Sequence, residues 1–201
     1  MKAVIFDLGN VLLPYDHRRT VAAVASLCEC DEKSVDEVFH ALGDQLGAGT
    51  LEATDFCQTL LVETGAPAGV TCDDLFDALC AGIGRDDEAL ACAVELQQRP
   101  QVTVGVISNT NQIHVAWLDD HVPELAELDL VMMSNEVELL KPDPEIFLLA
   151  LELLDVPPAQ AFFIDDQPVN VDAAAQLGMR ALLHHSWQET RPAIEAWLAE
   201  S

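Results

Sequence analysis

Five polar side chains follow short apolar runs of this chain, and they are of the types that bind or transfer phosphoryl groups. They are Asp7, Ser108, Lys141, Asp165 and Asp166. Ligands of an open parallel sheet bind beyond the carboxyl ends of its strands, so residues that follow successive strands meet at one edge. We therefore expect these five side chains to form one polar site.

The carboxylates of this set could supply both a cation site and a nucleophile. Mg²⁺ prefers oxygen ligands and usually takes one or two protein carboxylates, which Asp7 with Asp165 or Asp166 would provide. A carboxylate can attack phosphorus and form an aspartyl-phosphate when a cation and an ammonium group neutralise the incoming phosphate. Lys141 is one of only three lysines and the only one placed to do this.

Ser108 begins the stretch Ser-Asn-Thr-Asn, which leads into a predicted helix. Backbone N–H groups at a helix start, together with the Ser108 hydroxyl, can bind phosphate oxygens, and Asn111 can cap that helix. Each residue alone also has a structural explanation, because Asp after a strand is commonly a helix cap and Ser-Asn-Thr-Asn is ordinary turn chemistry. Their joint occurrence at successive strand ends favours the catalytic interpretation.

The elements that must position these residues alternate between strand and helix. Short apolar runs rich in β-branched residues predict strands at Ala3–Phe6, Val102–Ile107, Leu130–Met133, Ala161–Ile164 and Arg180–Leu183. Helical periodicity follows the later runs at 112–119, 144–154, 169–177 and 189–198. This alternation predicts an α/β fold with a parallel sheet.

The interval between the first two predicted strands contains helical patterns and no further strand. Helices are expected near Arg18–Cys28, Ser34–Leu42, Thr54–Glu63 and Asp73–Leu79, before a core helix from Asp86 to Gln98. We therefore expect residues 15–85 to form a small helical cap domain, inserted into an α/β core made of residues 1–14 and 86–201. Substrate choice should then depend on the cap, where Arg18 and Arg19 could meet substrate hydroxyls or lie on a solvated helix face.

Composition excludes two classes of partner. The 201 residues carry 9 Lys and Arg against 35 Asp and Glu, a formal charge of 9 − 35 = −26. Such a chain lacks the positive charge needed to bind a nucleic-acid backbone or an anionic membrane surface. The N-terminus shows no secretory signal pattern, and no apolar run approaches the roughly 18 residues that span a bilayer. We expect a cytoplasmic protein that acts on a small molecule.

The cysteines and the paired histidines are assigned no function. Six cysteines are scattered through helical-looking segments of the chain, as is typical of reduced thiols. Cys28 and Cys30 are too close together for the usual zinc knuckle. His184 and His185 are adjacent in an extended segment and point in opposite directions, so they cannot easily share a metal.

In four motifs the chain resembles the haloacid dehalogenase superfamily, in its phosphatase branch with a helical cap after the first strand. FDLGNVL resembles the first motif of that family, ISNTN the second, the Lys of LKPDPEIF the third and FFIDDQPVN the fourth. The resemblance covers nearly the whole chain and is closest to bacterial α-D-glucose-1-phosphate phosphatases. The N-terminal phosphatase domain of epoxide hydrolases is more distantly similar.

The resemblance implies a Rossmann-like α/β core, Mg²⁺ as the cofactor and a small phosphorylated metabolite as the substrate. It implies that Asp7 is the nucleophile and that Lys141 also takes part in catalysis. The implied phosphate-binding residues are Ser108, Asn109 and Lys141. The implied metal ligands are Asp7, Gly9 through its backbone carbonyl, Asp165 and Asp166.

The chain departs from the family pattern at Gly9. Phosphatases of the superfamily carry a second Asp at this position as general acid and base, and loss of a positioned acid/base typically lowers rates by about 10²- to 10⁴-fold. An anomeric hydroxyl is an acidic leaving group, so a sugar 1-phosphate would need less protonation than a sugar 6-phosphate. Asp16 and His17 are candidates to activate the water of the second step.

The leading hypothesis is a Mg²⁺-dependent phosphomonoesterase that acts on small phosphorylated metabolites, such as a sugar 1-phosphate, through an aspartyl-phosphate on Asp7. One alternative is a metal-independent 2-haloacid dehalogenase, but the Asp165-Asp166 pair argues against it because that chemistry needs no cation site. Another is a catalytically impaired phosphate-binding or regulatory protein, because of Gly9, and a sugar phosphate mutase is less favoured for the same reason. The sequence leaves the oligomeric state open between monomer and dimer.

Overall fold

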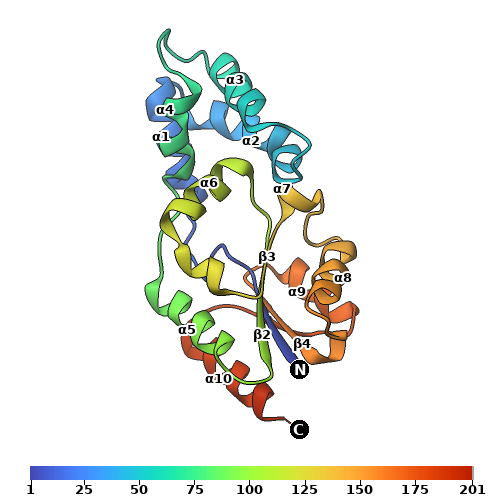
Figure 1. The fold of residues 1–201 in the computed structure, drawn as a ribbon. Helices are drawn as coiled ribbons and strands as arrows, with labels where there is room; N and C mark the ends of the chain where they lie inside the picture. Colours follow the sequence, from blue (N-terminus) through green and yellow to red (C-terminus); the bar gives the residue numbers. More distant parts are fainter. Residues whose placement is uncertain (201) are drawn as a thin grey trace.

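The computed structural model describes residues 1–200 as a five-stranded sheet flanked by helices, with a group of four helices at one end (Figure 1). In chain order the elements are β1 (Lys2–Phe6), α1 (His17–Cys28), α2 (Glu32–Gly47), α3 (Ala53–Glu63), α4 (Cys72–Cys80), α5 (Asp87–Gln97), β2 (Val102–Ser108), α6 (Gln112–His121), η1 (Pro123–Glu127), β3 (Leu130–Met133), α7 (Ser134–Val137), α8 (Pro144–Leu153), η2 (Pro158–Gln160), β4 (Ala161–Asp165), α9 (Pro168–Gln176), β5 (Arg180–Leu183) and α10 (Trp187–Ala199). Over these residues, every helix is too short or too polar to cross a bilayer.

All five strands are parallel, in the order β3-β2-β1-β4-β5. The predicted fold class and the five predicted strands are confirmed, and β2 and β4 run one residue further than predicted, to Ser108 and Asp165. β1 lies at the centre, between β2 and β4. Because these three strands end at the same edge, Asp7, Ser108 and Asp165 emerge side by side.

Both faces of the sheet are covered by helices, which explains why the central strand is apolar at successive positions. Val4 and Phe6 pack in one cluster with α5 and α10, whereas Ala3 and Ile5 pack in another with α8 and α9. Figure 1 shows these two helix pairs on opposite sides of the sheet. Burial on both faces fixes the direction in which β1 delivers Asp7.

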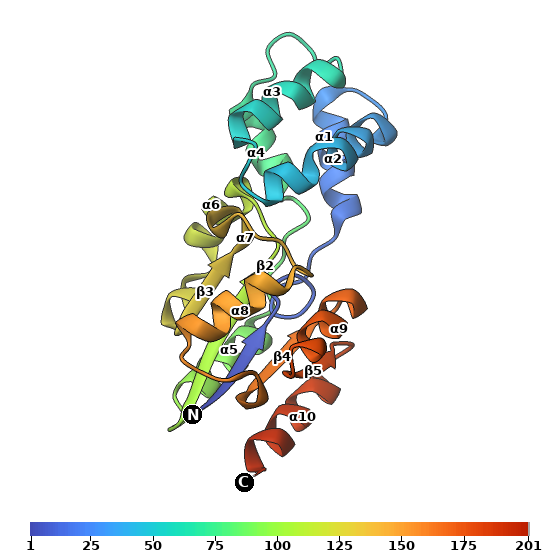
Figure 2. The same cartoon turned by 90° about the vertical axis from the view of Figure 1, so that its right-hand side faces the viewer.

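The helices α1–α4 pack together around a separate apolar core, to which Ile113 of α6 also contributes. Val24, Phe56, Leu60 and Leu75 are fully buried in this core. Figure 2 shows these helices at one end of the molecule and both chain termini at the other. The four helices predicted between the first two strands are therefore present, and they lie beyond the sheet edge at which the polar residues emerge.

The second of these helices is longer than predicted. α2 begins at Glu32 and continues to Gly47, instead of running from Ser34 to Leu42. The glycines in its last turns weaken the helical pattern, but Leu46 is buried in the core of the four helices, and packing overrides propensity. The segments η1, α7 and η2 were not predicted because elements of 5, 4 and 3 residues are too short to show a periodicity.

Ser134 links the end of α2 to the α/β core through hydrogen bonds. The hydroxyl of fully buried Ser134 accepts a hydrogen bond from the Thr110 N–H at 2.9 Å and donates one to the Gly47 carbonyl at 2.6 Å. Just beyond α2, Gly49 has φ +69° and lies so close to α7 that an added Cβ would overlap the Asn135 carbonyl. A hydrogen bond and close backbone approach thus hold α2 against α7.

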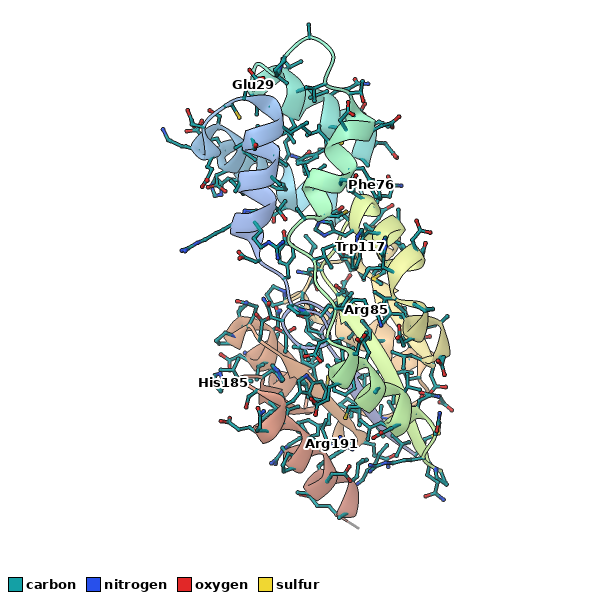
Figure 3. All side chains as sticks on the ribbon, turned by 90° about the vertical axis from the view of Figure 1, so that its left-hand side faces the viewer. Glu29, Phe76, Arg85, Trp117, His185 and Arg191 are labelled. Carbon is teal, nitrogen blue, oxygen red and sulfur yellow. The ribbon has the colours of Figure 1, made fainter. Side chains whose placement is uncertain are left out.

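A second contact holds the chain where it returns from the four helices to the core. Arg85 lies beside the start of α5 (Figure 3), where its guanidinium is 2.7 Å from carboxylate oxygens of both Asp87 and Glu124. Because these groups are partly exposed to solvent, screening by water limits the contribution of each pair to stability.

The contacts of the cysteines and of His184 are those of residues that stabilise the fold. All six cysteines are free thiols. Burial raises the pKa of Cys57 and of Cys80 to about 12, so both thiols stay protonated at neutral pH. The buried His184 ring has its Nδ1 atom 2.8 Å from the Thr190 hydroxyl.

Gly49→Ala should destabilise the protein more than Gly65→Ala. Both glycines have positive φ, so a Cβ at either position introduces strain of about 1–2 kcal/mol. Only the Cβ at Gly49 also overlaps a neighbouring backbone, because no atom lies within 4 Å of a Cβ built on Gly65. Such overpacking adds roughly 1–3 kcal/mol. Urea unfolding of both variants measures the difference, and equal losses would contradict the close approach of Gly49 to α7.

Candidate active site

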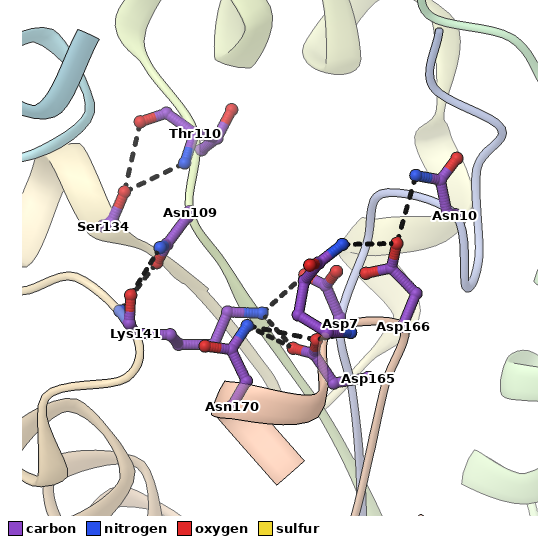
Figure 4. Close-up of polar contacts among 10 residues, drawn as sticks. Asp7, Asn10, Asn109, Thr110, Ser134, Lys141, Asp165, Asp166 and Asn170 are labelled. Atoms are coloured by element: carbon purple, nitrogen blue, oxygen red, sulfur yellow. Dashed lines mark hydrogen bonds and ion pairs between the residues drawn. The ribbon is translucent and has the colours of Figure 1, made fainter. Parts of the chain in front are cut away.

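A buried lysine joins two carboxylates at the carboxyl edge of the sheet. Lys141 Nζ lies 2.6 Å from Asp7 Oδ1 and 2.7 Å from Asp165 Oδ2 (Figure 4). Lys141 is 4% exposed and Asp165 is 0% exposed. Burying charged groups costs free energy that only close partners offset, so the two carboxylates depend on this one ammonium group.

Asp165 uses both of its carboxylate oxygens within the protein. Oδ1 accepts a hydrogen bond from the Gln167 N–H at 2.8 Å, and Oδ2 accepts the one from Lys141. The Asn170 amide, in the first turn of α9, donates to both oxygens at 3.1 Å. The start of α9 therefore fixes Asp165, and Asp165 in turn orients the lysine.

Asp166 completes a group of carboxylates that fits a divalent cation. Asp7, Asp165 and Asp166 offer oxygens that all lie within 4.8 Å of one another. Asp166 Oδ2 accepts hydrogen bonds from the amides of Asn10 at 3.2 Å and Gln167 at 2.9 Å. The other oxygen of Asp166, Oδ1, has no side-chain hydrogen-bond donor. The same holds for Oδ2 of Asp7, whose Oδ1 accepts the hydrogen bond from Lys141. Two carboxylate oxygens of this kind are the protein ligands that Mg²⁺ usually takes, with water and phosphate oxygens in its other positions.

The loop that carries Lys141 is held by Asn109. The Asn109 side chain donates to the Lys141 carbonyl and accepts from the Lys141 N–H, both at 2.8 Å. Ser108, at the end of β2, is buried and faces the same cavity as Asn109 and Lys141. The residues predicted to bind phosphate are therefore brought together, and the side chain of Asn109 also positions the lysine.

Burial raises the pKa of Asp7 to about 6, from an ordinary value of 3.8. The Lys141 ammonium opposes this rise in pKa, and the neighbouring Asp165 carboxylate adds to it. A cation beside Asp7 would favour the ionised form of this carboxyl group, which is the nucleophilic form.

A cavity of about 730 Å³ lies between the core and the four helices, next to the buried lysine. Its core wall includes Gly9, Ser108 and Lys141, and its opposite wall includes Phe39 and Gly47 of α2. A cavity of this size accommodates a small organic molecule.

Of the two candidates for water activation, only His17 lines the cavity. Asp16 is instead the N-cap of α1, where its carboxylate accepts a hydrogen bond from the Arg18 N–H at 3.0 Å. Arg18 and Arg19 are exposed and are not among the described residues that line the cavity, so they lie on a solvated helix face.

Three side chains that shape the site had no role in the sequence-based prediction. Asn10, with φ +58°, holds Asp166, Asn170 holds Asp165, and Ser134 links Thr110, in the loop after β2, to the end of α2. Both asparagines lie in the turns that directly follow the acidic residues, so the amide groups there were the available signal. Ser134 follows a strand that carries no candidate residue at its end, and only the tertiary structure reveals its contacts.

Comparison with known proteins identifies the family that the four sequence motifs resemble. A sequence model of the haloacid dehalogenase-like hydrolases matches residues 1–178. The D-ribitol-5-phosphate phosphatase of Bacteroides thetaiotaomicron is 26% identical over 188 residues, 89% of each chain. The validoxylamine A 7'-phosphate phosphatase of Streptomyces hygroscopicus subsp. limoneus is 30% identical over 186 residues, 89% of this chain and 83% of that protein.

The fold is also similar to a solved structure. A haloacid dehalogenase (HAD) family enzyme from Bacteroides thetaiotaomicron, in complex with magnesium and inorganic phosphate, superposes with a TM-score of 0.83 at 24% sequence identity. The match covers 94% of this chain and 98% of that chain. The likeness supports the fold as a whole, including the helices between β1 and β2.

Without divalent cations, the stability of the wild type relative to Asp7→Asn should fall as the pH rises from about 4 to about 6.5. Because the pKa of Asp7 is raised to about 6, the folded protein holds this proton more tightly than the unfolded chain does. The extra stability is present below the unfolded pKa and is lost as the pH passes the folded pKa, a change on the order of 2–3 kcal/mol.

Urea unfolding in EDTA across this pH range provides the measurement. The Asp7→Asn protein serves as the reference because its residue 7 cannot titrate, while all other acidic groups are shared. Parallel stability curves for the two proteins would show that the pKa of Asp7 is not raised.

Proposed function

The chain belongs to the haloacid dehalogenase-like hydrolase family, and we propose that it is a Mg²⁺-dependent phosphomonoesterase with Asp7 as its nucleophile. Its relatives are named as phosphatases of small phosphorylated compounds. The observation that carries the proposal is the Lys141 ammonium 2.6 Å from Asp7, with the Asp166 carboxylate beside them. This contact supports roles for Asp7 as the nucleophile, Lys141 as a fixed positive charge next to the cavity and Asp166 as a cation ligand.

The proposed reaction has two balanced steps. An oxygen of Asp7 attacks phosphorus, the bond from phosphorus to the ester oxygen breaks, and the alcohol leaves with the electron pair and takes up a proton. Water then attacks the phosphorus of the aspartyl-phosphate, and the bond to Asp7 breaks. Inorganic phosphate leaves, the Asp7 carboxylate is regenerated and the proton of the attacking water is released.

The surrounding residues stabilise the negative charge that both steps concentrate on the phosphoryl oxygens. Lys141 and Ser108, with the N–H groups that lead into α6, would bind these oxygens. Asp165 would keep the ammonium group in place. Asp7, Asp166 and the Gly9 carbonyl would hold Mg²⁺, which supplies the positive charge that lets a phosphate dianion approach a carboxylate.

Gly9 determines which esters react fastest in this proposal. It provides no carboxylic acid to protonate the departing oxygen, so alcohols that leave readily as anions are favoured. The anomeric hydroxyl of a sugar 1-phosphate is such a group. His17 is the cavity-lining residue that we propose for water activation in the second step.

We propose phosphorylated sugars or polyols as the substrate class. One relative is named for ribitol 5-phosphate and the other for validoxylamine A 7'-phosphate. The cavity of about 730 Å³ leaves room for a leaving group of this size beside the phosphoryl site. Residues 15–85 would act as the cap domain that selects the leaving group, since α2 forms the cavity wall opposite Lys141.

A 2-haloacid dehalogenase fits the site less well. In that reaction Asp7 would attack carbon and displace halide, which requires no cation. Such a reaction would not need the cation site that three carboxylate oxygens within 4.8 Å of one another could form. Halide release that persists in EDTA, without phosphate release from any ester, would favour this alternative.

Asp7→Asn should lower phosphate release by roughly 10⁴-fold or more, because removal of a nucleophile eliminates the covalent pathway. EDTA should abolish release by the wild type, and added Mg²⁺ should restore it. Phosphate release from sugar 1-phosphates, sugar 6-phosphates and an aryl phosphate is the measurement. Asp55→Asn, an exposed change on α3, is the matched control and should retain full activity. Undiminished turnover by Asp7→Asn would refute the proposed nucleophile.

Gly9→Asp should increase hydrolysis of alkyl phosphates relative to aryl phosphates by about 10²-fold, because it supplies the absent proton donor. The position accepts a side chain, since the nearest atom to a Cβ built on Gly9 is the Tyr15 Cβ at 3.9 Å. Gly9→Asn has nearly the same shape without the acid and should leave the ratio unchanged. Identical ratios of kcat/KM in all three proteins would contradict the role given to Gly9.

A further inference from the structure

We infer that the cavity selects phosphomonoesters whose leaving alcohol carries no second negative charge, and that Asp44 on α2 enforces this selection. The inference rests on the proposed phosphatase function and specifies the charge of its substrates. Neutral sugars and polyols meet the requirement, whereas bisphosphates and phosphorylated carboxylic acids do not.

The side chains that line the cavity are acidic or uncharged, apart from one engaged lysine. Asp44, Glu138 and Asp143 line it. Lys141 is the one lysine or arginine among the lining residues that the structure describes. Lys141 is already paired with two buried carboxylates, Asp7 and Asp165. A second anion on the substrate would therefore find no uncommitted lysine or arginine.

Neither histidine on the cavity wall supplies the missing positive charge. His114 Nε2 lies 3.2 Å from the Leu79 carbonyl, and burial lowers the pKa of this ring, so it is neutral at neutral pH. His17 Nε2 lies 3.4 Å from Asp36, so any charge on His17 already has a partner.

The remaining cations lie outside the cavity. Hydrogen bonds or ion pairs elsewhere engage Lys2, Lys33, Arg85, Arg99 and Arg191. Figure 3 shows Arg191 on the core, far from the cap helices. Arg18, Arg19 and Arg180 are exposed and absent from the described lining.

Two of the three acidic residues that line the cavity are free to act on a substrate. Within residues 1–200, the side chains of Asp44 and Glu138 form no hydrogen bond or ion pair, whereas the Asp143 carboxylate caps α8 through the Glu145 N–H at 2.9 Å. Hydroxyl groups of a sugar or polyol can donate to such carboxylates. A carboxylate or phosphate would be repelled by them, and because both residues are exposed, water moderates this repulsion.

Two matched substrate pairs test this inference. Glycerol 3-phosphate and 3-phosphoglycerate differ only in a hydroxymethyl group against a carboxylate, as do sorbitol 6-phosphate and 6-phosphogluconate at carbon 1. In each pair the anionic member should have a kcat/KM lower by about 10-fold or more. The assays are run with Mg²⁺ in about 0.15 M salt, where the Debye length is about 8 Å, so charges far from the cavity are largely screened while those on its wall still act.

A pair of variants assigns the effect to the cavity. Asp44→Asn should raise kcat/KM for 6-phosphogluconate by roughly 3- to 10-fold and leave sorbitol 6-phosphate nearly unchanged. Asp55→Asn removes the same charge from an exposed position outside the cavity and should change neither value. Thermal unfolding of both variants confirms that they are folded.

Equal kcat/KM within each pair would overturn the inference, as would equal effects of Asp44→Asn and Asp55→Asn. In both of those cases hydrolysis of the neutral esters leaves the proposed phosphatase function standing. If the enzyme hydrolyses none of glycerol 3-phosphate, sorbitol 6-phosphate and an aryl phosphate, the proposed function is overturned, and the inference with it.

Discussion

Two buried carboxylates share one ammonium group in this protein, and most of the local structure serves to hold that group. Asp7 and Asp165 come from adjacent strands, so the sheet itself places like charges next to each other. The Lys141 ammonium between them offsets the repulsion and the free energy of burial. The lysine comes from a loop without regular structure, and Asn109 fixes that loop by bonding both polar backbone groups of Lys141.

The same edge of the sheet couples the carboxylates to the helices above them. The end of β2 contributes Ser108 to the cavity, and just after this strand the Thr110 N–H donates a hydrogen bond to the Ser134 hydroxyl. Ser134 also bonds the end of α2, the helix that carries Phe39 and forms the opposite wall. The cavity wall formed by α2 is therefore linked through Ser134 to the loop that follows β2.

The sequence predicted the parts of this arrangement that follow from chain order and burial. The five strands were recognisable because a sheet covered on both faces needs unbroken apolar runs such as Ala3–Phe6. Residues at the strand ends were recognisable for the same reason, and the structure brings Asp7, Lys141 and Asp165 into contact. The hydrogen bonds that hold Asp165 against the lysine and Asp166 against Asn10 could not be predicted, because they depend on where the Asn10 and Asn170 side chains lie in the folded chain. The length of α2 and the role of Ser134 likewise depend on tertiary contacts that a periodic pattern does not encode.

The central claim is that Asp7 accepts the phosphoryl group, and chemical trapping tests it most directly. The enzyme is mixed with Mg²⁺ and a substrate, quenched in acid during turnover and reduced with borohydride, which converts an aspartyl-phosphate to homoserine. Mass spectrometry of the N-terminal peptide should then find homoserine in place of Asp7, in amounts that depend on substrate. Phosphate release accompanied by an unmodified Asp7 in every quenched sample, or by modification of another carboxylate, would contradict the account.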